Sequence, residues 1–247
     1  MLRIIDARTG EPVAAAPVRH GLTRVEAHAP GDGDGALRVL LVADLLIRAL
    51  ELDGTPVLAL LAGEGGPAAR AELRAAGAAL GIRPLEDGRD LPAGTGRGRA
   101  LHVVAEGAGA PEGVRVAVAP VLPAHPDAPA RSDTDPVTLR LALLSRHHRH
   151  PVPLDEDALR AAHGTLVRWR RAVADWARRP SRPVPDEVRD RLRGAWEDDL
   201  DVPEVLRVLR SVEQAGPELP DGARFETYAY ADRLLALDLT RDLGAPA

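Results

Sequence analysis

Short apolar runs alternate with helical patterns between residues 24 and 119, and this alternation narrows the choice of fold more than any other feature. The clearest run is residues 55–62, TPVLALLA, which lies between Gly54 and Gly63 and is typical of a strand buried on both faces. We also predict a strand pair at residues 2–13, strands at 24–29, 100–105 and 114–119, and helices at 36–52 and 67–80. Strands that alternate with helices form parallel sheets with right-handed crossovers. We therefore expect a small Rossmann-like sheet of the α/β class.

Two stretches rich in glycine and proline, residues 86–99 and 121–134, interrupt the apolar runs. The second stretch is polar and has no periodicity, which is typical of a domain boundary. The pattern therefore predicts a truncated Rossmann-like domain over residues 1–134, followed by a helical-bundle domain over residues 135–247.

The second half begins with a helix-start signal, because Asp135 can cap free N–H groups and the proline after it suits the first turn. A second helix is predicted over residues 159–176, where apolar side chains recur at steps of three and four. Trp169 and Trp176 lie on this apolar stripe, and we expect both in the core. The first helix is predicted to end before Pro151 and Pro153, and later helices to cover residues 185–196, 203–214 and 223–239.

The composition excludes several classes of protein. The 247 residues carry a formal net charge of -5, which argues against broad nucleic-acid binding, because phosphate neutralisation dominates that affinity. The chain contains no cysteine, which excludes disulfides, thiolate nucleophiles and cysteine-ligated zinc. No apolar run is long enough to span a membrane, and the first residues lack the apolar segment of a signal peptide. We therefore expect a cytoplasmic protein that makes no membrane contact.

One segment of the second half resembles a known family. The segment LRLALLSRHHRHPVPL starts at Leu139 and is similar to the one that follows the KMSKS loop of cysteinyl-tRNA synthetases and of the cysteine ligase of mycothiol synthesis. His147, Arg149 and Pro151 stand where those enzymes carry the same residue types. Nearer the start of the chain, the opening strands and ADLLIRALELDGTPVL, from Ala43, resemble the strands and the helix around the HIGH motif of the same enzymes.

A second segment supports the resemblance. WEDDLDVPEVLRVL, from Trp196, is similar to the DDDxxTPxAL helix junction of these enzymes. Asp198, Asp199 and Pro203 match the motif, whereas Val202 replaces its threonine. The resemblance therefore implies a class I synthetase-like sheet followed by helices.

The residues that would activate an amino acid are missing. Enzymes of this family stabilise charged phosphates with two histidines of HIGH and a lysine of KMSKS. Here the HIGH position falls on Gly33, Asp34, Gly35 and Ala36. The chain contains no lysine, and Arg131 supplies the only arginine charge where KMSKS is expected. The family's zinc also needs cysteine ligands. The resemblance thus favours a degenerate relative with no catalytic residues, no cofactor and no zinc.

The loop before the first long helix is the main candidate for a nucleotide site. Free N–H groups at a helix start can bind phosphate, although two aspartates repel it and Asp34 is equally suited to cap the helix. Asp32 and Asp34 alone are too few oxygen ligands for a hard cation. His102 and Glu106 stand in and after a predicted strand where ligands of an open α/β sheet bind, although a structural role is favoured for both. If ATP binds with magnesium, we expect it at Gly31, Asp32, Gly33, Asp34, Gly35, Glu64 and His102.

Two basic groups in the second half have structural interpretations. His147, His148 and His150 suggest a metal cluster, but neighbouring positions do not share a helix face, and cations are favourable near a helix C-terminus in any case. An arginine run could contact RNA, but nearby acidic clusters favour a solvated surface of mixed charge. The run comprises Arg168, Arg170, Arg171, Arg178, Arg179 and Arg182.

Three functions remain open. The favoured hypothesis is a non-catalytic pseudoenzyme that acts as a binding, regulatory or partner subunit, either as a homodimer or in complex with a functional ligase or synthetase. The alternative is a nucleotide-binding, ATP-dependent ligase with a rebuilt site. The third is a tRNA-binding module, which the net charge disfavours. A small-molecule ligand is compatible with the first two.

Overall fold

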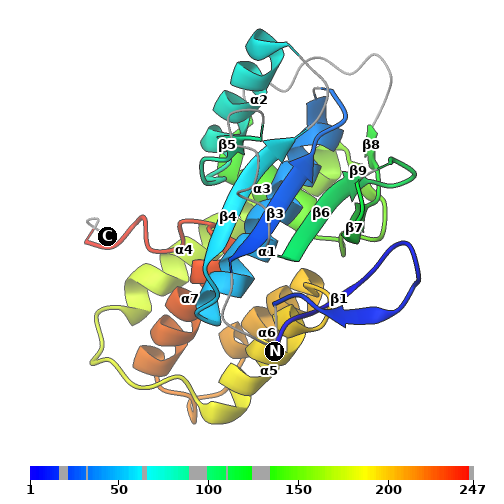
Figure 1. Cartoon of the computed structure of the whole chain (residues 1–247). Coiled ribbons are helices and arrows are strands. Elements are labelled where there is room, and N and C mark those ends of the chain that lie inside the picture. Colours follow the sequence, from blue (N-terminus) through cyan, green and yellow to red (C-terminus); the bar gives the residue numbers. More distant parts are fainter. Residues whose placement is uncertain are drawn as a thin grey trace.

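The structure is a computed structural model that describes residues 1–16, 22–31, 33–62, 66–88, 99–109, 111–123 and 134–244. At its centre lies a five-stranded parallel sheet with the strand order β5-β4-β3-β6-β7 (Figure 1). The strands are β3 (Thr23–His28), β4 (Val57–Ala62), β5 (Glu86–Asp87), β6 (Arg99–Ala105) and β7 (Val114–Val118). The predicted Rossmann-like α/β sheet is therefore confirmed, and the strand order reverses between β3 and β6.

Helices α1 (Gly33–Leu52) and α2 (Pro67–Ala79) connect the strands of the first half. Most side chains of α1 are buried, because the sheet covers one side of this helix and later helices cover the other. The helix begins three residues before the predicted start at residue 36, since Gly33 adopts a φ of +80° that leads directly into the first turn. Gly81, with a φ of +74°, follows the end of α2 as predicted.

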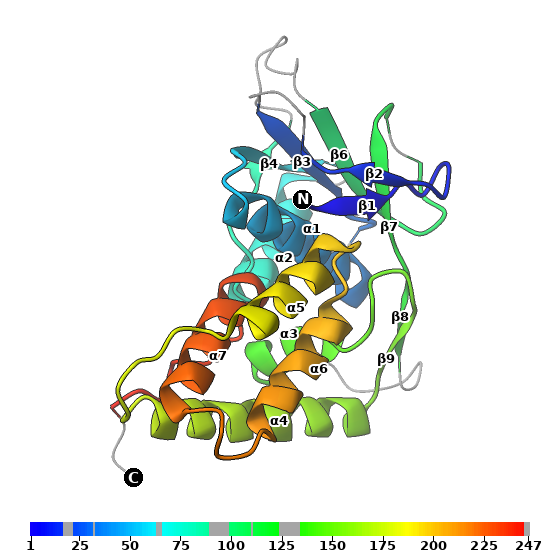
Figure 2. The same ribbon diagram turned by 90° about the horizontal axis from the view of Figure 1, so that it is seen from below.

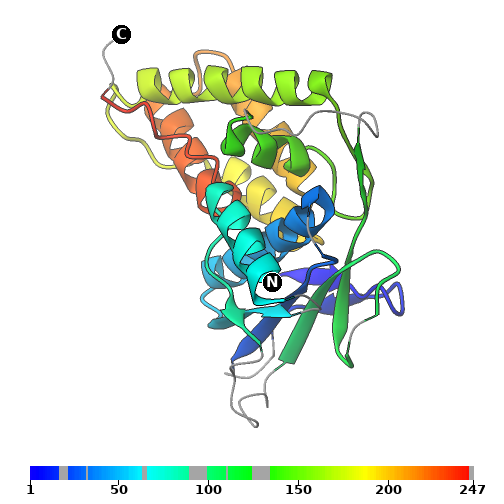
Figure 3. The same ribbon diagram turned by 90° about the horizontal axis from the view of Figure 1, so that it is seen from above.

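The two faces of the sheet differ in character. All helices of the described residues lie on one side of the sheet (Figures 2 and 3). On that side the strands present apolar side chains such as Val25, Leu101 and Val116, which are fully buried. On the opposite face, alternate positions carry polar side chains, including Glu26 and His102, which are register partners on β3 and β6. Strand alternation thus places the apolar residues against the helices and the polar residues on the other face.

The second half of the chain is largely helical, as predicted. Its helices are α3 (Pro136–Leu144), α4 (Glu156–Trp176), α5 (Asp186–Glu197), α6 (Val202–Glu213) and α7 (Asp221–Leu235). The last helix is shorter than the predicted residues 223–239, because Ala236 turns to a left-handed φ of +48°. The carboxylate of Asp232 accepts hydrogen bonds from the backbone N–H groups of Leu237 and Leu239, which stabilises this end.

Aromatic side chains concentrate in the helical part. Trp169 and Trp176 pack edge-on against Tyr228, with ring centroids 5.6 Å and 5.1 Å away, which is a favourable arrangement for aromatic pairs. Both tryptophans are buried, as predicted. One hydrophobic core includes these residues together with α1 and one face of the sheet. A division of the chain at residue 134 stays a prediction.

Buried arginines connect the two halves of the chain. Arg140 of α3 donates to the carboxylate of Asp44 at 2.8 Å and to the carbonyls of Leu80 and Leu235 at 3.1 Å and 2.6 Å. Burial alone would raise the pKa of Asp44, but Arg140 and Arg48 lower it below its usual value. The pair is therefore charged and fully hydrogen-bonded, which a buried ion pair requires.

Arg38 makes a second connection from α1. Its guanidinium donates to the carbonyls of Ala119, Pro120, His147 and His150, at 2.6 to 3.2 Å. These carbonyls belong to the end of the sheet and to the turn after α3. Arg38 therefore positions that turn against the sheet.

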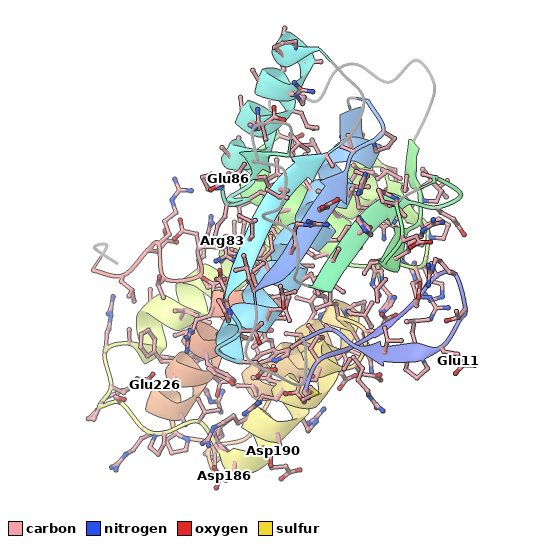
Figure 4. The ribbon with its side chains drawn as sticks, in the orientation of Figure 1. Glu11, Arg83, Glu86, Asp186, Asp190 and Glu226 are labelled. Atoms are coloured by element: carbon pink, nitrogen blue, oxygen red, sulfur yellow. The ribbon has the colours of Figure 1, made fainter. Side chains whose placement is uncertain are left out.

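Three short pairings complete the fold. The N-terminal hairpin of β1 (Arg3–Ile5) and β2 (Pro12–Ala14) confirms the predicted strand pair. Its exposed turn carries Glu11 (Figure 4). Two further strands, β8 (Val121–Pro123) and β9 (Val152–Leu154), pair in parallel in regions predicted as irregular. The prolines near residue 152 do end α3, but Val152 and Leu154 alternate inward and bury their side chains. Among the described helices, none has a stretch long and apolar enough to cross a bilayer.

Candidate functional site

Two glycines of the segment between β3 and α1 have an unusual backbone conformation. Gly31 and Gly33 adopt φ angles of +72° and +80°, a region that favours glycine. Asp34 then lies in the first turn of α1, where a negative charge is favourable. Of the predicted nucleotide-site residues, Asp32 and Glu64 lie outside the described residues, as does Arg131.

His102 is the predicted site residue with the most distinctive surroundings. Because β3 and β6 pair in parallel, His102 lies directly beside Glu26, with His28 two residues further along β3. Its Nδ1 atom is 3.0 Å from Nε2 of His28 and 3.2 Å from Oε2 of Glu26. Nε2 of His28 is 3.5 Å from the same carboxylate oxygen. Three side chains thus converge on one point of the polar sheet face; we call them the sheet cluster.

The carboxylate of the sheet cluster is held in its charged form. Hydrogen bonds from His102 and His28 lower the pKa of Glu26 far below its usual value of 4.5, against the opposing effect of burial. Arg24 adds to this with an ion pair of 2.5 Å to the other carboxylate oxygen. Both oxygens of Glu26 therefore have charged or polar partners.

A close-packed loop fixes the His102 ring. The connection from β6 to β7 passes over it, and Nε2 of His102 lies 3.2 Å from the carbonyl oxygen of Glu112. At Gly113, φ is +150° and a Cβ atom would stand only 2.8 Å from the imidazole ring. Only glycine fits this approach without displacing the ring.

A second group of similar residues lies where the helical part meets the N-terminal hairpin. Nε2 of His147 and Nε2 of His148 are each 3.8 Å from Oδ2 of Asp199. Arg149 approaches the same oxygen at 3.7 Å. We call His147, His148 and Asp199 the joint cluster. The sequence argument placed these histidines on a helix, but α3 ends at Leu144, so they follow it in a turn that lets neighbouring rings face one carboxylate.

Asp199 also anchors the hairpin. Its Oδ1 accepts from the N–H of Ile5 at 2.9 Å, and its own N–H donates to the carbonyl of Arg3 at 2.9 Å. The residue has a left-handed φ of +51°, which aspartate tolerates. The DDDxxTPxAL-like segment therefore joins the first strand to the helices, a role that its sequence alone does not reveal.

Burial dominates the electrostatics of the joint cluster. Desolvation raises the pKa of Asp199 to about 6, and it lowers the pKa of His148 well below its usual value. Within the part of the chain that the structure describes, Oδ2 of Asp199 and Nδ1 of His148 are buried without a hydrogen-bond partner. These unsatisfied atoms mark the joint cluster as an energetically costly arrangement.

A cleft opens beside this cluster at the carboxyl ends of β6 and β7. It is lined by Glu106 and Gly107 after β6, Ala119 after β7, and His148 and Arg149 of the turn. A neighbouring open groove is lined by Ile5, His147, Arg149, His150, Asp198, Asp199 and Asp201. The carboxyl ends of parallel strands are where α/β proteins bind ligands. The cleft therefore combines a favourable location with groups of both charges.

Two arginines of the predicted run have structural or ion-pair roles. Arg170 is buried and donates to the carbonyls of Leu237 and Asp238. Arg168 pairs with Glu213 at 2.7 Å. Exposed carboxylates of α5, at Asp186 and Asp190, project from the same helical part (Figure 4). This arrangement agrees with a surface of mixed charge.

Sequence reasoning found one member of the sheet cluster and missed two. It selected His102 for its place in the sheet, but it did not select Glu26 or His28. The sequence does contain a signal for these two residues. In TRVEAH, residues 23–28, polar side chains alternate with the side chains of a buried strand. The register that pairs Glu26 with His102 is a property of the folded sheet.

Comparison with known proteins finds several ligases that share one name. An L-cysteine:1D-myo-inositol 2-amino-2-deoxy-alpha-D-glucopyranoside ligase from Streptosporangium roseum is 37% identical over 117 residues, or 47% of this chain and 23% of the relative. Ligases of the same name from Thermobispora bispora and Rhodococcus jostii are 40% and 36% identical, over 32% and 43% of this chain and 19% and 26% of their own length. No protein-family model matches the chain.

These matches confirm the resemblance to the mycothiol cysteine ligases, which are relatives of the cysteinyl-tRNA synthetases. The parallel sheet with flanking helices, followed by further helices, is consistent with a class I synthetase-like fold. Each of these three matches covers about a quarter or less of the relative's length.

Proposed function

We propose that this chain is a ligand-binding protein built on the cysteine-ligase scaffold, and that it does not form an aminoacyl adenylate. The observation that carries the proposal is the start of α1. Where the resemblance implies two phosphate-stabilising histidines, residues 33–36 are Gly-Asp-Gly-Ala. Adenylate formation builds negative charge on phosphates, which cationic groups and N–H donors must stabilise. A carboxylate in the first turn opposes that charge.

The remaining polar groups support a binding role. The imidazole of His102 is engaged by Glu26, His28 and the carbonyl of Glu112. The cleft beyond β6 and β7 offers Glu106 and Arg149, which suits a small polar ligand with groups of both charges. In this proposal the protein binds such a ligand, or presents it to a functional ligase, as a non-catalytic subunit.

The decisive experiment is amino-acid-dependent exchange of pyrophosphate into ATP, measured with each of the twenty amino acids. We expect no exchange above background, while a functional cysteine ligase under the same conditions exchanges with cysteine. Exchange that depends on any amino acid would refute the proposal. It would favour the alternative of an ATP-dependent ligase with a rebuilt site.

Binding experiments separate the remaining alternatives. Titration calorimetry with ATP and magnesium tests the nucleotide hypothesis, and we expect no heat beyond dilution. A gel shift with tRNA at low and high salt tests the third hypothesis, because a tRNA complex would weaken steeply with salt. We expect no such complex. Co-purification from the native host would identify a partner ligase.

A further inference from the structure

The sheet cluster has the spacing of a metal-ligand set. Its three potential donor atoms are Oε2 of Glu26, Nε2 of His28 and Nδ1 of His102, and their separations are 3.0, 3.2 and 3.5 Å. Ligand atoms placed 2.0–2.2 Å from a tetrahedral zinc ion stand about 3.4 Å apart. One ion could therefore contact all three atoms with only small side-chain shifts.

We propose that Glu26, His28 and His102 form a binding site for a divalent transition-metal ion of the zinc type. Two imidazoles and one carboxylate are the ligands of many three-residue zinc and iron sites. Calcium and magnesium are disfavoured, because they require about six oxygen ligands. The site contains no thiolate, so it differs from the cysteine-ligated zinc that the family resemblance implies.

The surrounding groups orient the ligands for this role. The carbonyl of Glu112 can only accept a hydrogen bond, so Nε2 of His102 carries the hydrogen there. A bound ion would take the lone pair of Nδ1 in place of the hydrogen bond that this nitrogen donates to Glu26. Arg24 holds the second oxygen of Glu26 at 2.5 Å and leaves the first directed at the histidines. Partners of this kind commonly hold metal ligands in position.

The site is accessible from one side. His102 is buried beneath the loop, whereas the side chains of Glu26 and His28 keep exposures of 14% and 16%. An ion can reach the three donor atoms past these two residues. A site reached from solvent can exchange its ion, unlike a closed structural site.

The joint cluster is a weaker candidate for the same ion. Its imidazole nitrogens lie 3.8 Å from the Asp199 oxygen. The guanidinium of Arg149, 3.7 Å from that oxygen, already supplies a cation. The backbone N–H of Arg149 also points at Nδ1 of His147, at 3.3 Å, and this favours the ring form in which Nε2 holds the hydrogen. That form cannot ligate through Nε2.

The experiment measures metal binding directly and is independent of any enzymatic activity. The full chain is stripped with a chelator and titrated with Zn²⁺ by calorimetry, and with Co²⁺ by visible absorption. We expect one ion per chain and a Co²⁺ spectrum of low coordination number. His28→Ala and Glu26→Gln are each expected to weaken binding at least tenfold, and the absorption band should disappear.

Two matched variants serve as controls. His163→Ala removes an exposed imidazole from α4, and His147→Ala removes one from the joint cluster. Neither control substitution should change the affinity for Zn²⁺ or Co²⁺. Circular dichroism of every metal-free variant checks that it is folded. The proposal is overturned if the chain binds neither ion, or if His28→Ala and Glu26→Gln bind as tightly as the original chain. Loss of binding in His147→Ala alone would move the ion to the joint cluster and also overturn it.

Discussion

The sheet cluster and the joint cluster are built from the same residue types, two histidines and one carboxylate. The pKa values of the two carboxyl groups are nevertheless shifted in opposite directions. Glu26 has a lowered pKa because both histidines donate to it, whereas burial raises the pKa of Asp199 to about 6. The difference lies in hydrogen bonding. In the sheet cluster, the imidazole nitrogens lie 3.0 Å from each other and 3.2 and 3.5 Å from the carboxylate oxygen. In the joint cluster, both imidazole nitrogens lie 3.8 Å from the carboxylate oxygen.

The comparison shows that composition does not decide what a cluster does. A strand pair holds its side chains at fixed spacing, so the sheet cluster is satisfied and preorganised. The joint cluster lies at a junction of three segments, where Asp199 uses one oxygen for the hairpin, and no described residue forms a hydrogen bond with the other. The first arrangement is suited to binding an ion, whereas the second holds the junction together at an electrostatic cost.

The largest expected effect comes from the loop that covers the sheet cluster. Gly113→Ala places a Cβ atom 2.8 Å from the His102 ring at a φ of +150°. We expect a loss of about 3 kcal/mol in the free energy of unfolding, from backbone strain and overpacking combined. Urea denaturation measures it. Among the described residues, no atom lies within 4 Å of the Cβ that Gly109→Ala would add in the same loop, so this variant should cost far less. Equal costs would show that the close approach to His102 is unimportant.

A smaller effect is expected at the carboxylate of the sheet cluster. In chelator-containing buffer, Glu26→Gln should lower the free energy of unfolding by about 2 kcal/mol at pH 7, because the charged acceptor is lost. The lowered pKa means that the ionised group stabilises the fold above pH 4.5 and that this contribution disappears as the pH falls further. The difference in the free energy of unfolding between the original chain and the variant should therefore disappear at acid pH. Glu11→Gln, at the exposed hairpin turn (Figure 4), should show no such difference at any pH.

The smallest effect, with the opposite sign, is expected at the joint cluster. Asp199→Asn keeps an acceptor for the N–H of Ile5 and tolerates the left-handed φ. Because the pKa of Asp199 is raised from 3.8 to about 6, its ionisation opposes folding above that range. The variant should be more stable by about 1 kcal/mol at pH 8, and the gain should vanish below pH 3.8. Thermal unfolding at both pH values, with Asp190→Asn as an exposed control, checks this; destabilisation at pH 8 would contradict it.

Much of the fold could be predicted from local patterns. The strands at β3, β4, β6 and β7 and the helices from α1 to α7 follow from apolar periodicity, and buried Trp169 and Trp176 follow from one helical stripe. The short strands β5, β8 and β9 could not be predicted in the same way, because two or three residues carry too little periodicity. Their existence depends on a neighbouring strand that supplies hydrogen bonds.

The sequence by itself determined that this protein forms a parallel α/β sheet followed by helices, because periodicities of two and of three to four residues are local properties of the chain. It also determined the missing imidazoles at the start of α1, since that is a matter of residue identity. Only the tertiary structure decided that Glu26, His28 and His102 meet, and that Asp199 reaches both the hairpin and two histidines. Such meetings depend on strand register and on the packing of segments up to 194 residues apart, which no local pattern encodes.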